Sequence, residues 1–370
     1  MKIVCTKYNL LNAVNISLKA VPSRTTMSIL ESIVIDASED QIKLISNDME
    51  MGIETIVDGE IIERGMVALD AKILSEIVRK FPESFITITV DENLETTITC
   101  EKAVFNIVGK RGEEFSFLPE VEKEKSIYIS QFSLKEIIRQ TIFSIADNDN
   151  NKLMTGELFE VNADELKVTS LDGHRISIRK IKLKESFENI KVIVPGKTLI
   201  EISKILSGEA DSIVKMFFTR NHILFEFEKT KVVSRLIEGE YFKIDQMLSS
   251  DYETKVKINK KELFDCIERA SLLIREGDKK PIIITIEAAK AEIRIDTTTG
   301  SMEEDIIVEK EGKEIKIGFN PKFIVDALRV IEDDDIEMFF VNPKAPCFIK
   351  QKEDKYTYLI LPVNFSSASN

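Results

Sequence analysis

The chain has 370 residues, 43% of them apolar and 31% charged, which is enough for two or three domains with cores of their own. Its formal net charge of −13 argues against nucleic-acid binding, although net charge averages over surfaces that face different ways. No apolar run reaches the roughly 18–20 residues of a membrane span, and the first residues lack the apolar stretch of a signal peptide. The four scattered cysteines form no C-x-x-C pair, so we expect them to be reduced and buried in a cytoplasmic protein with no membrane partner.

The first third of the chain predicts strands and two helices. Residues 1–5 predict a strand, and Thr6 then caps a helix whose apolar positions share one face: Leu10, Leu11 and Val14. Asp70 caps a second helix, in which apolar residues follow the 0, 3, 4, 7 spacing: Leu74, Ile77, Val78 and Phe81. Short β-branched runs at 33–35 and 86–90 predict strands.

The middle third shows the same order of elements. Ser130 opens a helix with an apolar face: Leu134, Ile137, Ile138 and Ile142. A second helix keeps most of the expected spacing: Leu199, Ile202 and Leu206. Pro195 precedes this helix and breaks the capping pattern. Residues 225–227 predict a strand.

The last third repeats the order once more. Asn259 opens a helix with Leu263, Ile267 and Ala270 on one face, and residues 282–286 predict a strand. Asn320 caps the second helix, and Pro321 stands in the first turn, where proline is tolerated. The apolar positions of this helix again follow the 0, 3, 4, 7 spacing: Ile324, Ala327, Leu328 and Ile331.

These elements form a long internal repeat. The first helices align at Leu10, Leu134 and Leu263, and the second helices at Lys72, Lys197 and Lys322, the latter at a spacing of 125 residues. A period this long excludes solenoid repeats and predicts three similar domains. We expect an α+β fold with domains at 1–122, 123–250 and 251–370, each with two helices and about eight short strands in antiparallel sheets. Charged linkers are expected at 120–125 and 249–253.

A search for catalytic or metal chemistry finds little. Residues 194–198 resemble the end of a phosphate-binding loop, but Lys191 stands where its first glycine is required. The two histidines, His174 and His222, have no zinc-ligand spacing, and the acidic run 332–335 is typical of a solvated turn. We therefore expect no catalytic residue, no cofactor and no metal.

One segment, 170–176, occurs only in the middle copy. It follows a predicted strand, and Gly173 permits a tight turn. One interpretation is a β-turn in which Asp172 and His174 make local hydrogen bonds. A second interpretation is an enzyme that uses these two residues with Lys197, although no nucleophile and base are paired by the sequence. Because the repeated parts build the scaffold, this unrepeated turn is the better candidate for a specific function.

Several short motifs, in their order and spacing, resemble the bacterial DNA polymerase III beta subunit family, the sliding clamps. The resemblance covers essentially the whole chain, and the segments that carry it are 24–30, 48–50, 172–175, 192–195, 317–320 and 358–362.

The resemblance implies a non-catalytic processivity factor that closes as a head-to-tail homodimer. Six domains would form a ring around duplex DNA, with basic helices lining the hole and the acidic excess outside, which resolves the charge problem. The implied partners are the DNA polymerase III alpha subunit, the clamp loader delta subunit, and other replication and repair proteins with a clamp-binding motif. The DNA-facing residues, by matching position, are Arg24, Lys72, Arg79, Asn148 and Lys197.

The resemblance also implies a pocket between the second and third domains that binds linear peptides with apolar anchors and a glutamine. Its lining, carried over by position, is Met154, Leu171, Gly173, His174, Arg175, Ile176, Phe242, Met247, Leu359, Leu361, Pro362 and Val363. Phe242, Gln246 and Asn364 depart from the family, whose members often have proline, arginine and a basic residue there. These departures bear on which peptides are preferred.

The implied dimer seam joins the first domain of one subunit to the third domain of the next. Phe105 and Ile107 would meet Leu272 and Leu273 across it. Acidic residues would face basic ones, with Glu303, Glu304 and Asp305 opposite Lys102 and Lys110. Two other functions stay open from the residues alone: the enzyme described above, and an adaptor unrelated to DNA, which would be a monomer without a basic hole.

Overall fold

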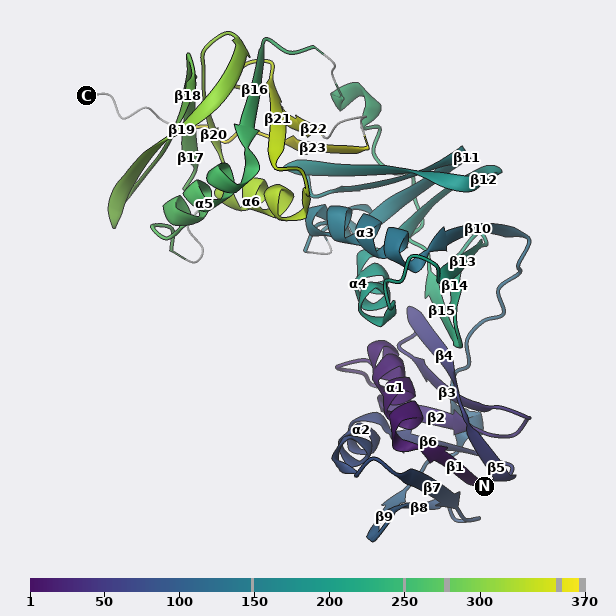
Figure 1. Cartoon of the computed structure of the whole chain (residues 1–370). Coiled ribbons are helices and arrows are strands. Elements are labelled where there is room, and N and C mark those ends of the chain that lie inside the picture. The colour runs from purple at the N-terminus through teal and green to yellow at the C-terminus, as the bar shows by residue number, and fades with distance from the viewer. Residues whose placement is uncertain (148–149, 249–250, 276–279, 351–354, 366–370) are drawn as a thin grey trace. The chain divides into compact units, whose positions relative to one another are not determined.

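The computed structural model describes residues 1–147, 150–248, 251–275, 280–350 and 355–365 (Figure 1). These residues form two compact units. Unit 1 comprises Met1–Leu134 and Lys197–Leu236, and unit 2 comprises Lys135–Gly196 and Ile237–Asn370. Every strand pair in the described parts is antiparallel, as the α+β prediction requires.

Six α-helices occur in the described ranges, two in each third of the chain. Their bounds are α1 Lys7–Ser17, α2 Ala71–Lys80, α3 Gln131–Thr141, α4 Gly196–Ile205, α5 Lys260–Ser271 and α6 Pro321–Val330. The predicted caps are confirmed: Thr6, Asp70, Ser130, Asn259 and Asn320 each accept a hydrogen bond from a backbone amide in the first turn, at 2.8–3.2 Å. Pro195 lies at the end of a strand, and α4 begins directly after it.

Unit 1 contains two sheets. The five-stranded sheet has the order β5-β1-β7-β8-β9, and the eight-stranded sheet has the order β10-β13-β14-β15-β4-β3-β2-β6. The pairing of β4 with β15 joins a strand from the first third of the chain to one from the middle third. The bounds are β1 Lys2–Thr6, β2 Ser32–Asp36, β3 Ile42–Asn47, β4 Met51–Val57, β5 Gly59–Glu63, β6 Met66–Asp70, β7 Phe85–Val90, β8 Glu95–Cys100, β9 Ala103–Val108, β10 Lys125–Ser130, β13 Ile213–Phe218, β14 His222–Phe227 and β15 Thr230–Arg235.

The helices α1 and α2 lie side by side in unit 1 and share one core with both sheets. The predicted faces are buried, including Leu10 and Val14 of α1 and Leu74 and Val78 of α2. They pack with residues from both sheets, for example Ile33 of the eight-stranded sheet. Burial of each such side chain contributes about 2 kcal/mol, so the apolar spacing in the sequence accounts for this arrangement.

Unit 2 contains one ten-stranded sheet with the order β11-β12-β23-β22-β21-β16-β19-β18-β17-β20. Here β12 pairs with β23, which again joins the middle third to another third. The bounds are β11 Gly156–Leu171, β12 Arg175–Pro195, β16 Thr254–Asn259, β17 Ile282–Glu287, β18 Lys290–Thr297, β19 Gly300–Gly312, β20 Ile315–Phe319, β21 Asp335–Phe340, β22 Cys347–Lys350 and β23 Tyr356–Ile360.

The expectation of about eight short strands per copy is wrong for the middle third. That third has six strands in the described residues, and two of them, β11 and β12, are 16 and 21 residues long. The long strands pass through register shifts between Val161 and Glu165, so one continuous pair spans what the sequence breaks into several runs. The polar residues at these shifts resemble turn residues in the sequence.

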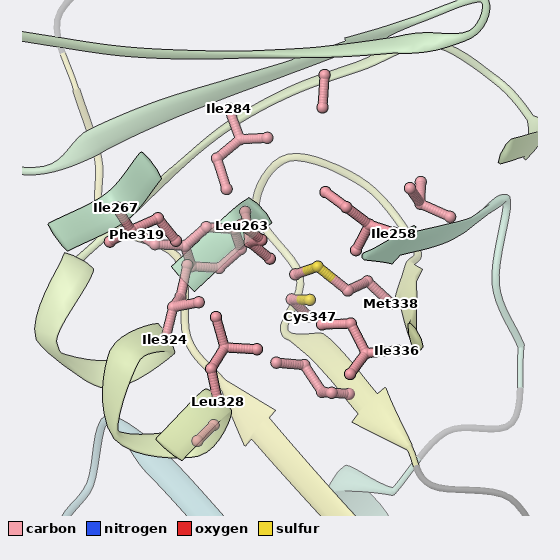
Figure 2. Packing of buried hydrophobic residues seen from close by; sticks show 14 of the residues in the cluster. Ile258, Leu263, Ile267, Ile284, Phe319, Ile324, Leu328, Ile336, Met338 and Cys347 are labelled. Carbon is pink, nitrogen blue, oxygen red and sulfur yellow. The ribbon is translucent and has the colours of Figure 1, made fainter. Parts of the chain in front are cut away.

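Side chains from α5 and α6 pack on this sheet in the last third of the chain (Figure 2). Figure 2 shows Leu263 and Ile267 of α5 near Phe319. Ile324 and Leu328 of α6 belong to the same cluster of buried side chains. All are buried. The core thus fixes α6 against the strands that precede the chain's final segment, and α6 reappears below in the site.

Short 3₁₀ turns complete the described chain: η1 Leu18–Ala20, η2 Ser28–Glu31, η3 Gly112–Glu114, η4 Ile142–Ser144, η5 Lys152–Thr155 and η6 Asp245–Met247. The two compact units divide the middle third between them, because its sheets are shared with the neighbouring thirds. The domain boundaries after residues 122 and 250 therefore stay predictions.

Candidate functional site

A cavity of about 140 Å³ lies within unit 2, and it is almost entirely apolar. Its walls come from the β11–β12 turn, from β23 with the residue after it, and from the segment around η6. The lining residues are Met154, Leu171, Gly173, His174, Arg175, Ile176, Phe242, Ile244, Met247, Pro346, Leu359 and Leu361. Pockets for drug-sized ligands measure roughly 300–1,000 Å³, so this cavity suits one or two apolar side chains of a larger partner.

The β11–β12 turn is held by its own aspartate. Asp172 Oδ1 accepts hydrogen bonds from the backbone amides of His174, at 2.9 Å, and Arg175, at 3.1 Å. Gly173 has φ +88°, a conformation that favours glycine, and a Cβ there would meet nothing within 4 Å. The glycine is therefore required by the backbone rather than by crowding. The local hydrogen-bond interpretation of this turn is confirmed for Asp172.

The strand β23 binds the turn from the other side. Ile176 pairs with Leu359, and the amide of Leu361 donates to the His174 carbonyl at 2.9 Å. Two walls of the cavity thus belong to one hydrogen-bonded ladder, although their residues are far apart in the sequence.

Arg175 is the polar centre of this region, and its side chain is almost completely buried. Its Nε donates to Asp172 Oδ2 at 2.8 Å and its Nη1 to Asp326 Oδ2 at 2.7 Å. The guanidinium lies over the ring of Phe323, 4.6 Å from the centroid, and near that of Phe143.

Burial opposes the charged form of Arg175, but its contacts outweigh this effect. Tyr358 and Asp326 raise the pKa of Arg175 above its ordinary value, so the guanidinium stays charged at every physiological pH. A charge that is buried and paired in this way is costly to disturb, because either partner alone would be left unpaired.

The turn also caps the C-terminal end of α3 and η4. Side chains donate to three backbone carbonyls there: Ser177 to Gln140, Ser170 to Thr141, and Arg175 to Phe143. Carbonyls at a helix end lack intrahelical partners and favour a positive charge. The β11–β12 hairpin is therefore bonded to the helix before it as well as to β23.

The third wall of the cavity is exposed and adaptable. Met247 is 55% exposed and Phe242 is also exposed, while Ile244 between them is buried. Exposed large apolar side chains next to an apolar cavity indicate a surface that a partner covers, and methionine adapts to different shapes. Phe242 is one of the residues that departs from the family pattern, and its side chain lines this cavity.

All but two of the predicted pocket residues line this one cavity. Pro362 and Val363 do not line it, because the chain turns away after Leu361 and the Val363 amide donates to the Gly318 carbonyl at 2.8 Å. The sequence prediction missed Ile244 and Pro346, which line the cavity. It also missed Asp326 and Phe323, which hold Arg175; both lie on a helix whose spacing indicates only core packing.

The geometry gives the enzyme interpretation no support. The Asp172 carboxylate is bonded to backbone amides and to Arg175, and the His174 ring stacks on Phe323, with 6.1 Å between ring centroids. Lys197 is ion-paired with Asp48 in unit 1. No group of three or more potential metal-ligating residues occurs in the parts of the chain that the structure describes. No helix among the described residues has the length and apolar character that crossing a membrane requires.

The candidate DNA-facing residues differ in whether their side chains are bound to other residues of the chain. Arg24, in the loop before η2, and Lys72 and Arg79 of α2 are exposed. Arg79 donates to the Ser75 hydroxyl at 3.2 Å. Lys197, at the start of α4, is ion-paired with Asp48, whose side chain is only 4% exposed. Asn148 lies outside the described residues.

Most of the candidate seam residues lie on strand edges, and Leu272 and Leu273 follow α5. β9, which carries Phe105 and Ile107, is an edge strand of the five-stranded sheet in unit 1. The Phe105 ring packs edge-on against Phe81, and Ile107 is half-buried against the same core. Val108, at the end of β9, is 79% exposed. An open edge with apolar side chains is a template for pairing with another chain.

In unit 2, residues 300–307 of β19 pair with β18 on one side, whereas β16 pairs only with the later part of the strand, from Val308 onward. Ile307 on this edge is 83% exposed, and Leu272, after α5, is 84% exposed. Leu273 is partly buried in the core. Glu303 is exposed, and Glu304 accepts a hydrogen bond from Arg269 Nε at 3.0 Å.

Comparison with known proteins identifies the family. Three family models of the DNA polymerase III beta subunit match the chain: the N-terminal domain at residues 1–119, the central domain at 128–243 and the C-terminal domain at 245–364. A protein named Beta sliding clamp from Staphylococcus epidermidis is 36% identical over an alignment of 366 residues, gaps included, that covers 95% of this chain and 96% of that one. Its namesake in Staphylococcus aureus is 35% identical over 94% of this chain and 95% of that one.

Solved structures agree with this result. A candidate DNA polymerase III beta subunit from Eubacterium rectale is 65% identical, with a TM-score of 0.97 and 99% of each chain covered. The DNA polymerase sliding clamp of Bacillus subtilis is 34% identical, with a TM-score of 0.96, over 99% of this chain and 100% of that one. The chain therefore belongs to the family of DNA polymerase III beta subunits, the sliding clamps.

Proposed function

We propose that this protein is a sliding clamp that encircles duplex DNA as a homodimeric ring and tethers the replicative polymerase through the cavity in unit 2. The family is that of a processivity factor of DNA replication rather than an enzyme. The observation that carries the proposal for this chain is the small apolar cavity beside a rigid polar turn. Such a site suits capture of a linear peptide better than chemistry on a small substrate.

The cavity supports a division of roles in peptide capture. Leu171, Ile176 and Leu361 would receive the apolar anchors, while the backbone and side chains of the His174–Arg175 turn would orient polar groups such as a glutamine. Met247 and Phe242 are exposed in the free protein and would close over the peptide. The alpha subunit of the polymerase, the delta subunit of the clamp loader and repair proteins would compete for this site.

The two open edges support a head-to-tail dimer. One edge is β9 in unit 1 and the other is residues 300–307 of β19 in unit 2, and each carries apolar side chains in water. Pairing one with the other would extend the sheet from one protomer to the next and close a ring, because the interface is heterologous. Phe105 and Ile107 would then meet Leu272 and Leu273, as predicted from the family.

The exposed cations support DNA binding without sequence recognition. Arg24 lies on a loop of unit 1, and Lys72 and Arg79 lie on α2. Exposed cations of this kind can contact phosphates, and such contacts do not depend on the base sequence. Weak contacts suffice, because the closed ring would hold the DNA topologically while it slides.

The pocket is tested with Leu361→Asp. A labelled peptide with a glutamine and two apolar anchors should lose at least about 100-fold in affinity, because a carboxylate would be buried without a partner. Fluorescence anisotropy measures the binding, and gel filtration checks that the dimer persists. Ile62→Asp is the matched control, since Ile62 is a half-exposed apolar residue on β5 in unit 1. Unchanged peptide affinity in Leu361→Asp would reject the pocket.

The ring is tested by topology. After loading, the protein should remain on circular DNA in high salt and leave when the circle is cut once. Retention on linear DNA with free ends would contradict topological binding, and a monomer at micromolar concentration would favour the adaptor instead.

A further inference from the structure

The helix α6 contacts residues that line the cavity, although no residue of α6 lines it. Asp326, in the middle of α6, accepts from Arg175 Nη1 at 2.7 Å. Phe323, one turn earlier, lies under both the Arg175 guanidinium and the His174 ring. The Phe323 carbonyl accepts from the Tyr358 hydroxyl at 2.7 Å, and Tyr358 precedes the lining residue Leu359 on β23. A single helical turn thus contacts two walls of the cavity.

The two carboxylates bound to Arg175 fix the orientation of its guanidinium. The Arg175 guanidinium is planar, so its bonds to Asp172 on one edge and Asp326 on another fix both its position and its plane. Asp172 belongs to the same turn as Arg175 and moves with it. Asp326 belongs to α6, which is anchored in the separate core of Figure 2 by Ile324 and Leu328. The bond to Asp326 therefore ties the turn to a fixed element.

We propose that Asp326 is a positioning residue for the partner-peptide pocket. It acts through Arg175, with Phe323 as its apolar support, and holds the His174–Arg175 turn in the geometry that the peptide requires. This inference rests on the proposed function of the cavity. Without Asp326, Arg175 keeps Asp172 and the Phe143 carbonyl, so the turn persists locally. It then loses its ion pair to α6 and keeps only the ring contacts with Phe323, which fix the plane of the guanidinium less strictly.

The test is Asp326→Asn, which keeps the shape and removes the charge. The labelled peptide of the pocket experiment should bind about tenfold more weakly, in the range that coupling energies between contacting residues produce. The loss should lie mainly in a slower association rate, measured by stopped flow, because fewer molecules hold the turn ready for the peptide. Asp326→Glu, which restores a carboxylate, should recover part of the affinity.

A matched control removes another carboxylate that pairs with α6. Glu268 of α5 accepts from Arg329 of α6 at 3.0 Å, and neither residue is hydrogen-bonded to Arg175. Glu268→Gln should leave peptide binding unchanged, which shows that losing an ion pair of α6 does not by itself weaken the peptide. Because this pair is exposed, the change should cost less thermal stability than Asp326→Asn, which breaks a buried pair. Phe323→Leu gives a second route to the same prediction if Asp326→Asn folds poorly, since it keeps an apolar side chain.

The outcomes distinguish the two proposals. If Leu361→Asp abolishes binding and Asp326→Asn binds like the unmodified protein, the positioning role is wrong and the pocket stands. If Asp326→Asn and Glu268→Gln weaken binding equally, or if Asp326→Glu recovers nothing beyond Asp326→Asn, the effect is structural and the positioning role is also wrong. A protein that binds the peptide neither before nor after these changes overturns both proposals.

Discussion

Glu157 is a carboxyl group that the fold keeps out of water. It lies near the start of β11, fully buried, and neither of its oxygens has a hydrogen-bond partner among the described residues. The nearby Thr141 hydroxyl donates to the Ile137 carbonyl at 2.7 Å instead. Burial raises the pKa of Glu157 to about 8, outweighing the opposite influence of Thr141. The side chain is therefore a neutral acid at neutral pH.

This acid makes stability depend on pH. In the unfolded chain its pKa is near 4.5, so the unfolded state loses the proton first. The free energy of unfolding should fall as pH rises from about 4.5 to 8 and then level off, with a total change on the order of 5 kcal/mol. Glu157→Gln should remove this slope and raise the thermal midpoint at pH 7.5, as thermal unfolding at several pH values would measure.

A surface glutamate of the same strand provides the control. Glu160 pairs with Lys167 and Lys191 on the surface of β11, so Glu160→Gln should keep the slope. A slope that survives in full in Glu157→Gln would show that other groups cause it and would contradict the assignment to Glu157.

Single residues also show where sequence reasoning stops. The Asp172–Gly173 turn was predicted because its parts are adjacent and each has a strong local preference. Arg175 and Asp326 are 151 positions apart. Asp326 has nothing around it in the sequence that indicates a buried ion pair, since one polar residue in an amphipathic helix is typical of a solvated face.

Among the elements, the edge strand β9 carries the clearest prediction. Val108 is exposed at its end, and a dimer seam would cover it. Val108→Lys should raise the dissociation constant of the dimer on the order of 100-fold, because a lysine buried without a partner is costly. Light scattering during gel filtration, over a dilution series, measures the change.

The other edge of the same sheet supplies the comparison. β5 forms that edge and carries the half-exposed Ile62. Ile62→Lys therefore makes the same kind of change as Val108→Lys, from an apolar side chain on an edge strand to a lysine. It should leave the dimer intact. Equal effects of the two lysines, or none from Val108→Lys, would contradict the assignment of the seam to β9.

Elements with local signals were predictable, and their long-range partners were not. All five caps and the apolar faces of the helices are confirmed, since a cap or a helix face is decided within a few residues. The pairings β4–β15 and β12–β23 depend on strands from different thirds of the chain, which alternation within one strand does not specify. The long β11–β12 pair was missed for a different reason, because the polar residues at its register shifts resemble turn residues in the sequence.

In the whole molecule, the repeated helices and the unrepeated β11–β12 turn suit different roles. The second helix of each third carries a lysine at the second residue of its first turn: Lys72, Lys197 and Lys322. The cavity, in contrast, is built from the turn that occurs only in the middle third and from the chain's last strand. Repetition thus suits a surface that surrounds DNA evenly, while a single docking site suits one partner per protomer.

The net charge of the chain does not determine whether it binds DNA. Local ion pairs determine which lysines and arginines can contact phosphates. Lys72 is exposed and has no carboxylate partner within the described ranges. Lys197 has the same position in its helix, but Asp48 neutralises it. The equivalent lysines should therefore contribute unequally to DNA binding, with Asp48 competing against phosphate for Lys197.

Salt dependence measures this difference directly. With a labelled short duplex, Lys72→Gln should reduce the slope of log affinity against log salt by about 0.9 for each phosphate that the protein no longer neutralises. Lys197→Gln should reduce the slope less, and Asp48→Asn should raise both affinity and slope by freeing the Lys197 ammonium group. Equal slopes for the two lysine variants, together with no gain in Asp48→Asn, would mean that DNA displaces the aspartate at no cost, and the inequality proposed here would be wrong.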